Sequence, residues 1–400
     1  MTSPTPATHR AAMPARELLP LLALTLSAFL LNTSEFVPIG LLTDIAGAFG
    51  LSESGAGLMI SVYAWAVAAL SLPLMIAASR VSPKGLITAV LALFCAGQVA
   101  SAVAPTFELL VLARLVVAAS HAVFWSVASP FAVRLVAPER ASLAMSLIVT
   151  GTSVAMIFGL PLGRALGLAL GWRMTFACVF ATGLVALVGL LALFPRLPKG
   201  EAFTLARLPE LGRNRSLLGI YLATILFSSG YYTAYSYVEP FLQQVAHVPS
   251  ELVTVALTVF GVAGLAGSWL FARLFDAHRR AFLSATMVGI TVALLSLAPL
   301  AGLAAGPFVV CALWGASATA YNVAAQAEII RVTPEDASAV AMSVFSGLFN
   351  VGIGLGSVVG GIVCDGPGIE LVGVVGGIVA AAGAAFCVTR LGAMLERPAA

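Results

Sequence analysis

Three ionisable side chains stand inside long apolar stretches of the sequence, where they could exchange protons. Glu35 precedes Pro38 in the first stretch, and Arg114 and His121 share a later one. Charge is expensive inside a lipid bilayer, so ionisable groups at that depth are candidates for proton transfer. We expect Glu35 to be the main proton carrier, coupled to His121 and to Arg114, which could pair with it directly or through a water. The alternatives are a carboxylate held by backbone donors and a histidine that only packs.

Polar and aromatic side chains in the same stretches could bind a hydroxylated ligand. Amide and hydroxyl groups pair with sugar hydroxyls, while aromatic rings stack on the apolar faces of sugars. Asn350 is the polar exception among glycines that more simply serve close helix packing. Anchoring at the membrane surface explains other aromatic residues equally well. The predicted substrate contacts are Glu35, Tyr63, His121, Trp125, Tyr232, Tyr321, Asn322 and Asn350.

Residues near the ends of the apolar stretches are candidates for gating. Arg80 follows the second stretch, Pro161 interrupts the fifth, and Glu239 stands near the end of the seventh. We expect these three residues to take part in opening and closing a path through the protein. Arg164, in the fifth stretch, could pair with Glu35 or extend to the membrane surface along its apolar stem.

The remaining charged residues and cysteines form no catalytic or metal-binding pattern. The lysines are Lys84 and Lys199, and neither follows glycine in a phosphate-binding loop. The five cysteines fall in or beside apolar runs, without metal-ligand or redox spacing. Glu328 and Arg331 have one-turn spacing, which predicts a structural pair on one helix. We therefore expect that the protein is not an enzyme and has no catalytic residue, metal or cofactor. The expected energy source is a proton gradient.

The elements that position these residues are predicted to be helices that span a membrane. Of 400 residues, 60% are hydrophobic and only 9% are charged, whereas soluble domains carry about 25% charged residues. This composition excludes a soluble enzyme, a disordered regulator and a nucleic-acid binder. One span needs about 20 apolar residues. Twelve runs meet that need: 18–42, 55–78, 85–104, 108–133, 142–169, 174–194, 217–241, 253–275, 281–302, 307–330, 339–363 and 369–391.

Basic residues orient these predicted helices. With the N-terminus in the cytoplasm, all of the 20 Lys and Arg residues except Arg114, Arg164 and Arg173 fall in inside loops, as the positive-inside rule requires. Both termini are then cytoplasmic. The predicted organisation is a cytoplasmic segment 1–17, a six-helix half 18–194, a cytoplasmic linker 195–216, a second six-helix half 217–391 and a cytoplasmic tail 392–400.

The two halves share a repeated sequence. The run 134–146, RLVAPERASLAMS, recurs as RVTPEDASAVAMS over 331–343, in each case between the fourth and fifth spans of a half. Glu35 and Pro38 in the first span are matched by Glu239 and Pro240 in the seventh. Two similar six-helix halves are typical of transporters that bind their substrate at mid-membrane, between the halves.

Several segments resemble the major facilitator superfamily, in particular its twelve-span proton-driven exporters and, among these, bacterial sugar efflux transporters. They are NTSEFVPIGLLTD (32–44), SHAVFW (120–125), GLPLGR (159–164), GWRMTF (171–176), YTAYSYVEP (232–240) and FSGLFNVGIG (345–354). The resemblance implies an all-α fold of twelve transmembrane helices in two six-helix pseudo-repeats, located in a bacterial inner membrane. Arg114 fills the basic position of the exporter motif, and the loop at Arg80 lacks the acidic residue usual in the superfamily.

The expected function is proton-coupled efflux, by alternating access, of sugars or sugar-like small molecules. The expected partners are that substrate, protons and the lipid bilayer, without nucleic acid, and the protein is expected to be a monomer. A multidrug/proton antiporter of the same fold is the first alternative, because an acid and an aromatic cavity also suit lipophilic cations. A facilitator without coupling, or a membrane sensor, would leave Glu35 and Arg114 without a coupling role.

Overall fold

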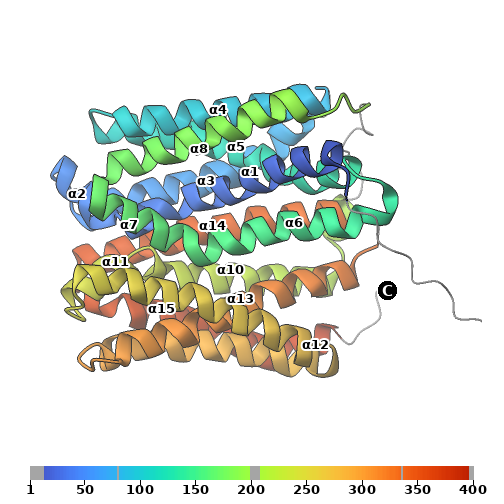
Figure 1. Cartoon of the computed structure of the whole chain (residues 1–400). Coiled ribbons are helices and arrows are strands. Elements are labelled where there is room, and N and C mark those ends of the chain that lie inside the picture. Colours follow the sequence, from blue (N-terminus) through green and yellow to red (C-terminus); the bar gives the residue numbers. More distant parts are fainter. Residues whose placement is uncertain (1–12, 79–80, 199–207, 335–336, 396–400) are drawn as a thin grey trace, which may run out of the picture.

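The computed structural model describes residues 13–78, 81–198, 208–334 and 337–395, which form a bundle of helices (Figure 1). The first half of the chain comprises α1 (Ala15–Gly40), α2 (Leu42–Phe49), α3 (Glu53–Ala78), α4 (Pro83–Val103), α5 (Phe107–Arg134), α6 (Ala141–Val154), a π-helical turn (Ala155–Gly159), α7 (Leu160–Leu170) and α8 (Trp172–Leu193). The second half comprises α9 (Leu208–Leu211), α10 (Arg215–Tyr235), α11 (Val238–Gln244), α12 (Ser250–Leu300), α13 (Gly306–Val332), α14 (Ser338–Asp365), α15 (Val372–Phe386) and α16 (Gly392–Leu395).

The described residues contain eleven helical stretches that are long and apolar enough to cross a membrane. The longest, α12, has 51 residues and a non-helical His278 in its interior (φ −137°, ψ 42°). At about 1.5 Å per residue, a helix of this length exceeds twice the roughly 30 Å of a bilayer core. It therefore comprises two spans joined at His278, which gives twelve spans and confirms the predicted all-α membrane fold.

Small polar residues and one glycine set the ends of several helices. The side chains of Ser82, Thr106 and Asn214 accept hydrogen bonds from backbone N–H groups of the first turns of α4, α5 and α10. Such caps satisfy donors that have no partner within the helix. Gly50 ends α2 in the left-handed conformation (φ 64°), which glycine adopts without steric penalty. The helix boundaries thus fall at the polar residues and glycines that separate the apolar runs.

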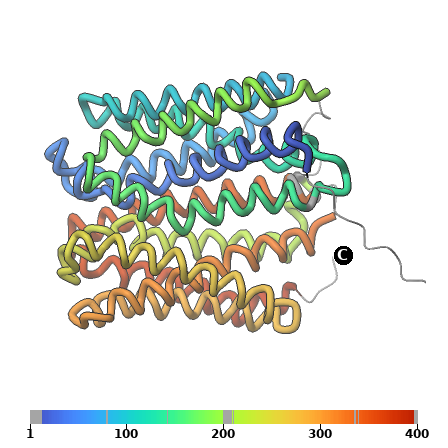
Figure 2. The backbone as a smooth tube through the Cα atoms, viewed as in Figure 1, coloured from blue at the N-terminus to red at the C-terminus, as the bar shows by residue number. Residues whose placement is uncertain are grey.

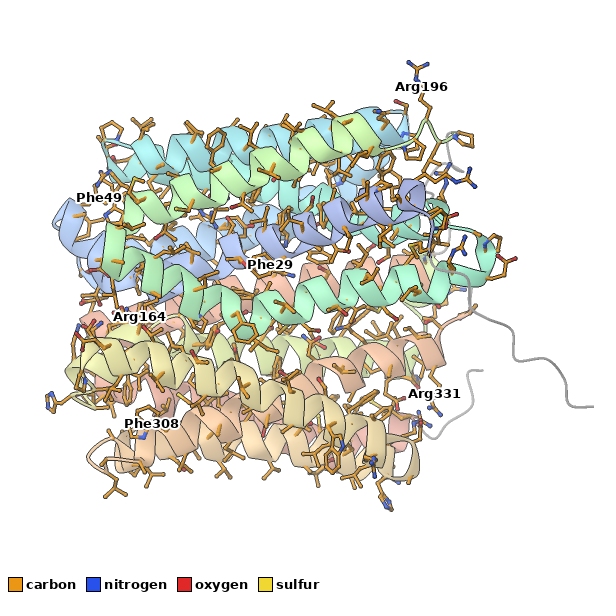
Figure 3. The ribbon with its side chains drawn as sticks, in the orientation of Figure 1. Phe29, Phe49, Arg164, Arg196, Phe308 and Arg331 are labelled. Atoms are coloured by element: carbon orange, nitrogen blue, oxygen red, sulfur yellow. The ribbon has the colours of Figure 1, made fainter. Side chains whose placement is uncertain are left out.

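The helices of the two halves form two groups that lie side by side (Figures 1 and 2). The start of α1 and the short α16 lie at the same end of the bundle, which we call the terminal end, and α2 and α11 lie at the opposite end. Arg196 and Arg331 lie at the terminal end, whereas Phe49 and Phe308 lie at the opposite end (Figure 3). The assignment of the terminal end to the cytoplasm is a prediction from the basic residues of the sequence.

Glycines at four-residue spacing pack two pairs of helices at close range, and the two pairs are equivalent in the repeat. A Cβ atom on these glycines would collide with the neighbouring helix, so no larger residue fits without a shift. In the first half they lie in the fifth span and face α1: Gly159, Gly163 and Gly167. In the second half they lie in α14 and face α10: Gly352, Gly356 and Gly360. The internal repeat is therefore visible in the packing.

The two halves meet along two helix pairs, α3 with α14 and α12 with the fifth span. In the first pair, the Nε1 atom of Trp65 donates a hydrogen bond of 3.4 Å to the carbonyl oxygen of Val351. In the second pair, Gly261 lies against the backbone of Ile157. At the opposite end, α11 also contacts α1 and α2. The contacts of α11 therefore join the two halves at the opposite end, in addition to the two helix pairs.

Candidate functional site

Two of the residues predicted to take part in proton coupling, Glu35 and His121, are neighbours in the structure. Oε2 of Glu35, near the end of α1, lies 3.7 Å from Nε2 of His121 in the middle of α5. The side chain of Glu35 keeps 14% of its surface accessible, whereas that of His121 keeps 5%. The carboxyl group thus stands inside the bundle and remains within reach of small solutes. This arrangement suits a group that takes up and releases protons.

Arg114 binds the backbone beside Glu35 instead of the Glu35 carboxylate. Its guanidinium donates hydrogen bonds of 2.8 Å to the carbonyl oxygen of Ser34 and 2.9 Å to the Ser34 hydroxyl. Pro38 has no N–H, so the usual helical hydrogen bond to the carbonyl of Ser34, four residues earlier, is missing. Arg114 supplies the missing donor. The side chain of Gln98 also donates to the Ser34 hydroxyl.

Tyr63 of α3 joins these groups through its ring. The guanidinium carbon of Arg114 lies 4.6 Å from the centre of the Tyr63 ring, in cation–π geometry. His121 approaches the same ring edge-on, at 5.9 Å between centroids, and Trp125 lies 6.0 Å beyond His121. The predicted proton-coupling residues and two predicted substrate contacts therefore form one cluster within the first half.

A small cavity adjoins this cluster at the boundary between the halves. Its volume is about 10 Å³, and its polar side chains are Glu35, Tyr63, Arg114 and Tyr232. Tyr232 belongs to α10 of the second half. The cavity thus joins the predicted proton-coupling site to the second half, but it is far too small for a sugar in this conformation.

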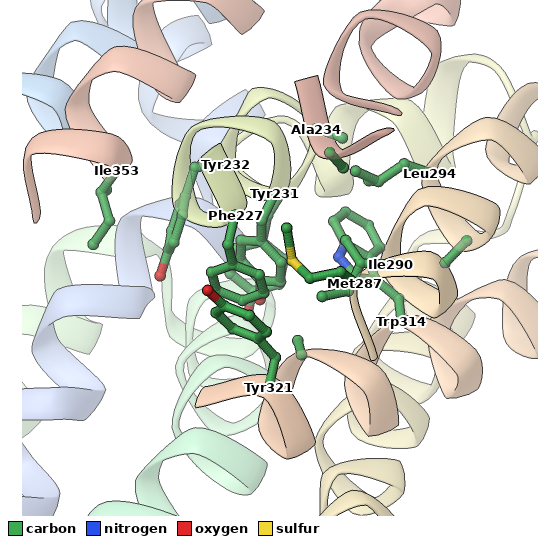
Figure 4. Packing of buried hydrophobic residues seen from close by; sticks show 14 of the residues in the cluster. Phe227, Tyr231, Tyr232, Ala234, Met287, Ile290, Leu294, Trp314, Tyr321 and Ile353 are labelled. Atoms are coloured by element: carbon green, nitrogen blue, oxygen red, sulfur yellow. The ribbon is translucent and has the colours of Figure 1, made fainter. Parts of the chain in front are cut away.

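The predicted substrate contacts of the second half divide between an aromatic core and its edge. Tyr321 is fully buried and stacks on Phe227 at 4.3 Å between ring centroids (Figure 4). Tyr232 points away from this stack, towards the side where Ile353 lies. Asn322, half-buried, accepts a hydrogen bond from Gln326 of the same helix. Tyr321 therefore packs within the aromatic core. Tyr232 and Asn322 lie at the edge of that core and are better placed to reach a ligand.

Asn350 lies at the contact between the halves. It precedes Gly354 by one helical turn, and Gly354 packs against Trp65 of α3. The Asn350 amide donates to the carbonyl of Ser346 in its own helix, whereas its buried Oδ1 atom has no hydrogen-bond partner among the protein atoms. The Oδ1 atom of Asn350 is therefore available for a further hydrogen-bond partner.

Arg164 and Glu239 form a buried ion pair between the halves near the opposite end. Nη1 of Arg164 lies 2.8 Å from Oε1 of Glu239, and both side chains are fully buried. Arg164 also donates to the carbonyl of Gly40 and to Ser250, while Thr43 donates to Glu239 through its backbone N–H and its hydroxyl. Arg164 therefore neither pairs with Glu35 nor extends to the membrane surface.

Of the other two predicted gating residues, Pro161 is described and Arg80 lies outside the described residues. Pro161 is buried in the first turn of α7, directly after the π-helical turn Ala155–Gly159. Because proline has no N–H, the carbonyl of Ile157 is left without its usual helical partner. Gly261 of α12 approaches this same carbonyl. Pro161 thus shapes the point where the fifth span meets the second half.

The prediction that Glu328 pairs with Arg331 is wrong. Glu328, fully buried in α13, binds Arg279. Arg331 instead pairs with Asp276 at 3.0 Å, in an exposed position. One-turn spacing placed the two residues on neighbouring turns, but partners from α12 lie closer to each of them. These pairs join the two helices at the terminal end.

Sequence reasoning missed the small polar residues that hold the charged ones. Ser34 anchors Arg114 and its hydroxyl accepts a further hydrogen bond from Gln98, while Thr43 and Ser250 complete the ion pair of the opposite end. Serine and threonine are frequent in membrane helices, so their type alone gives no signal. For Ser34 the sequence contained one signal. Pro38, four residues later, has no N–H group to donate to the Ser34 carbonyl, so that carbonyl needs another donor.

The fold and the site define a class of protein: a multi-pass membrane transporter built from two six-helix halves, and not an enzyme. The family model of the Major Facilitator Superfamily matches residues 24–327 and 220–399. The chain belongs to the Major Facilitator Superfamily.

Solved structures of transporters share this fold. A bacterial homologue of the human lysosomal transporter Spinster, in an inward-facing and unoccupied conformation, is 19% identical, with a TM-score of 0.79 over 96% of this chain and 98% of that one. The same homologue in an inward-facing and occupied conformation gives a TM-score of 0.74 at 19% identity, over 92% of this chain and 95% of that one. A human organic anion transporter is 15% identical, with a TM-score of 0.70 over 94% and 99% of the two chains.

Proposed function

We propose that this transporter exports sugars or sugar-like small molecules in exchange for protons, across a bacterial inner membrane and with both termini in the cytoplasm. The observation that carries the proposal is the Glu35–His121 contact of 3.7 Å, beside a cavity that residues of both halves line. An accessible carboxyl group at the boundary between two moving bodies can be exposed first to one side of the membrane and then to the other. The proton gradient is the energy source, and no further cofactor is required.

Alternating access connects the two ligands in the proposed cycle. With the terminal end in the cytoplasm, the closed opposite end corresponds to an inward-facing state, in which sugar binds while Glu35 is ionised. Rearrangement of the halves separates Arg164 from Glu239 and exposes the site to the outside. Protonation of Glu35 there promotes sugar release. The protonated carrier returns and delivers its proton to the cytoplasm.

The proposed substrate site lies between the cluster around Glu35 and the edge of the aromatic core. Trp125 offers a half-buried ring for stacking on a sugar face, and Tyr232 a hydroxyl directed away from the core. Asn322 and the unpartnered Oδ1 atom of Asn350 add hydrogen-bonding groups on the second half. The resemblance of six sequence segments to bacterial sugar efflux transporter B also supports a sugar substrate.

A multidrug/proton antiporter is the second candidate, because the rings of Tyr232, Tyr231 and Phe227 form a continuous aromatic surface. Such a surface also suits lipophilic cations. Organic anions belong in the comparison as well, since a structurally similar human protein is an organic anion transporter. The polar side chains of Glu35 and His121 in the first half and of Asn350 in the second favour hydroxylated ligands over both classes.

Reconstituted protein tests the proposal. Liposomes containing the transporter receive an imposed pH gradient, and uptake of labelled monosaccharides, disaccharides, a lipophilic cation and an organic anion is measured with and without a protonophore. We expect saturable sugar transport that the protonophore abolishes. Gradient-driven transport of the cation but of no sugar would establish the second candidate. Sugar transport indifferent to the pH gradient would identify an uncoupled facilitator.

A further inference from the structure

The cavity beside Glu35 has the dimensions of a single water molecule. Its volume is about 10 Å³, and a buried water occupies roughly 10–15 Å³ on this measure and needs two to four polar partners. Most of the cavity wall is apolar, formed by side chains such as Ile60 and Ile353. Hydrogen bonds are therefore available only from the few polar residues in the wall.

Two of these polar residues carry buried atoms that no protein group satisfies. The Tyr63 hydroxyl and Nε of Arg114 have no hydrogen-bond partner among the protein atoms, although Tyr63 is only 3% exposed and Arg114 only 1%. Buried polar groups in folded proteins are nearly always paired, by protein or by water. Both residues line the same cavity as Glu35. The cavity thus offers a donor, a hydroxyl and a carboxyl group to one small polar molecule.

Arg114 cannot easily turn towards Glu35, because Ser34 holds its two terminal nitrogens. The cation and the carboxyl group therefore face the cavity without a direct ion pair. A direct pair would have to be broken each time the carboxyl group is protonated, at the cost of leaving a buried cation unpaired. A water between them could reorient instead, while Arg114 keeps its bonds to Ser34.

We propose that this cavity binds one water molecule, held by the Tyr63 hydroxyl and Arg114, that delivers the coupled proton to Glu35. The inference rests on the proposed function. In the transfer step, one O–H bond of the water breaks as its proton moves to a carboxylate oxygen of Glu35. A new O–H bond forms with a proton from a hydrated proton of the access path, so the water is regenerated. Tyr63 orients the water and is not ionised.

Other titratable groups also face Glu35 and share its environment. They are His121 and Arg114 of α5, Tyr63 of α3, and Tyr232 and Tyr235 of α10. Direct transfer through His121 is the competing route, since its Nε2 atom is 3.7 Å from the Glu35 carboxyl group. The two routes predict different consequences of removing the Tyr63 hydroxyl.

The test replaces Tyr63 by phenylalanine. Y63F removes the hydroxyl but keeps the ring on Arg114, so the fold and the cation–π contact remain. The matched control is Y221F, which removes a hydroxyl that donates to the carbonyl of Ala341 in the second half, outside the cavity. Both variants, as full-length protein in liposomes, are assayed for pH-driven sugar transport and for sugar counterflow, which needs no net proton transfer.

We expect Y63F to slow pH-driven transport roughly threefold to tenfold, the effect of one net hydrogen bond. Its counterflow should fall less than its pH-driven transport, and both rates in Y221F should match those of the wild type. Unchanged pH-driven transport in Y63F would overturn the proposal and favour His121. Equal loss of both rates would make Tyr63 a substrate contact and would also overturn it. If wild-type protein shows counterflow but no pH-driven transport, the proposed function itself fails.

A second variant tests the water by a different route. Ala64 lines the cavity and is only 1% exposed, so A64V places methyl groups in the space while the Tyr63 hydroxyl is retained. We expect the same selective loss of pH-driven transport as in Y63F. An experimental structure at high resolution should also show a water at hydrogen-bond distance from the Tyr63 hydroxyl in wild type, and none in A64V. A cavity that excludes water in the wild type would overturn the proposal.

Discussion

Arg164 in the first half and Glu239 in the second form an ion pair of 2.8 Å in which neither side chain is accessible to solvent. A buried pair is strongly destabilised when one partner is removed, because the other charge is then left uncompensated. In this protein, separation of the halves would part Arg164 from Glu239 and leave each charge without its partner. Opening of the opposite end therefore requires new partners, or water, for both residues.

Replacing Glu239 by glutamine should weaken the closed state of the opposite end. The change leaves the Arg164 cation buried without its anion, at a cost of about 3 kcal/mol or more. A destabilisation of the closed state by that amount shifts the equilibrium between the closed and open states of the opposite end towards the open state. Spin labels on the exposed residues Leu51 and Leu252, in otherwise cysteine-free protein, should then report longer distances across this end.

The control for this prediction is Gln244→Ala, which removes an exposed hydrogen bond between Gln244 and Glu53 at the same end. We expect an unchanged distance distribution, since exposed polar contacts contribute little. A glutamine at position 239 with the wild-type distance distribution would show that the buried pair does not hold the end closed.

Replacing Arg114 by lysine should destabilise the protein although the charge is kept. One ammonium group cannot reproduce the two hydrogen bonds of Arg114 to Ser34, because it lacks the planar fork of a guanidinium. The carbonyl without a helical partner would lose its donor, at a cost of roughly 1.5–3 kcal/mol. Thermal unfolding in detergent should show a lower midpoint. Arg196→Lys, at an exposed position, should leave the midpoint almost unchanged; equal shifts would contradict this role of Arg114.

Two glycines of α14 should differ sharply in their tolerance of alanine. A Cβ atom on Gly356 would collide with the backbone of α10 at Ser229, whereas a Cβ atom on Gly347 would meet nothing within 4 Å. Overpacking typically destabilises by about 1–3 kcal/mol, while alanine in place of glycine favours a helix by up to about 1 kcal/mol. Gly356→Ala should therefore lower the unfolding midpoint and Gly347→Ala should maintain or raise it. The opposite order would refute the packing of α10 on α14.

The two ion pairs at the terminal end should also differ in strength. Glu328 is fully buried and Arg279 is largely covered, whereas Arg331 and Asp276 are exposed. Arg279→Ala leaves a buried carboxylate unpaired and should destabilise the protein by about 3–5 kcal/mol. Asp276→Asn should change stability by less than about 1 kcal/mol. Chemical unfolding of both variants measures the difference, and similar losses would show that burial does not govern these pairs.

The fold was largely predictable from the sequence, because membrane insertion depends on local composition. Each spanning segment is recognisable as a run of about 20 apolar residues. Capping residues such as Thr106 and Asn214 mark where helices begin. The exception is the turn between the eighth and ninth spans. A charged stretch from Asp276 to Arg280 predicted a break, but the structure keeps the chain helical on both sides of a kink at His278.

The site was predictable only in part, because pairing across helices depends on rotation and depth that sequence spacing does not fix. Glu35 and His121 were both assigned to proton coupling, and the structure places them side by side. Arg164 pairs with Glu239, 75 positions along the chain, whereas the sequence left open a pair with Glu35 or extension to the membrane surface. The carbonyl of Ser34, which has no helical donor because of Pro38, shows which features of a sequence can predict a contact between helices. A carbonyl deprived of its helical donor requires another donor, and here that donor is Arg114.

The central claim is that Glu35 carries the coupled proton, and proton movement in liposomes tests it most directly. Wild-type and Glu35→Gln proteins are reconstituted with a pH-sensitive dye inside, and sugar is added outside without an imposed gradient. The account predicts that sugar entry through the wild-type protein drives protons out and raises the internal pH, whereas the variant, in which residue 35 cannot ionise, moves no protons when sugar is added. Proton movement of wild-type size in Glu35→Gln would contradict the account.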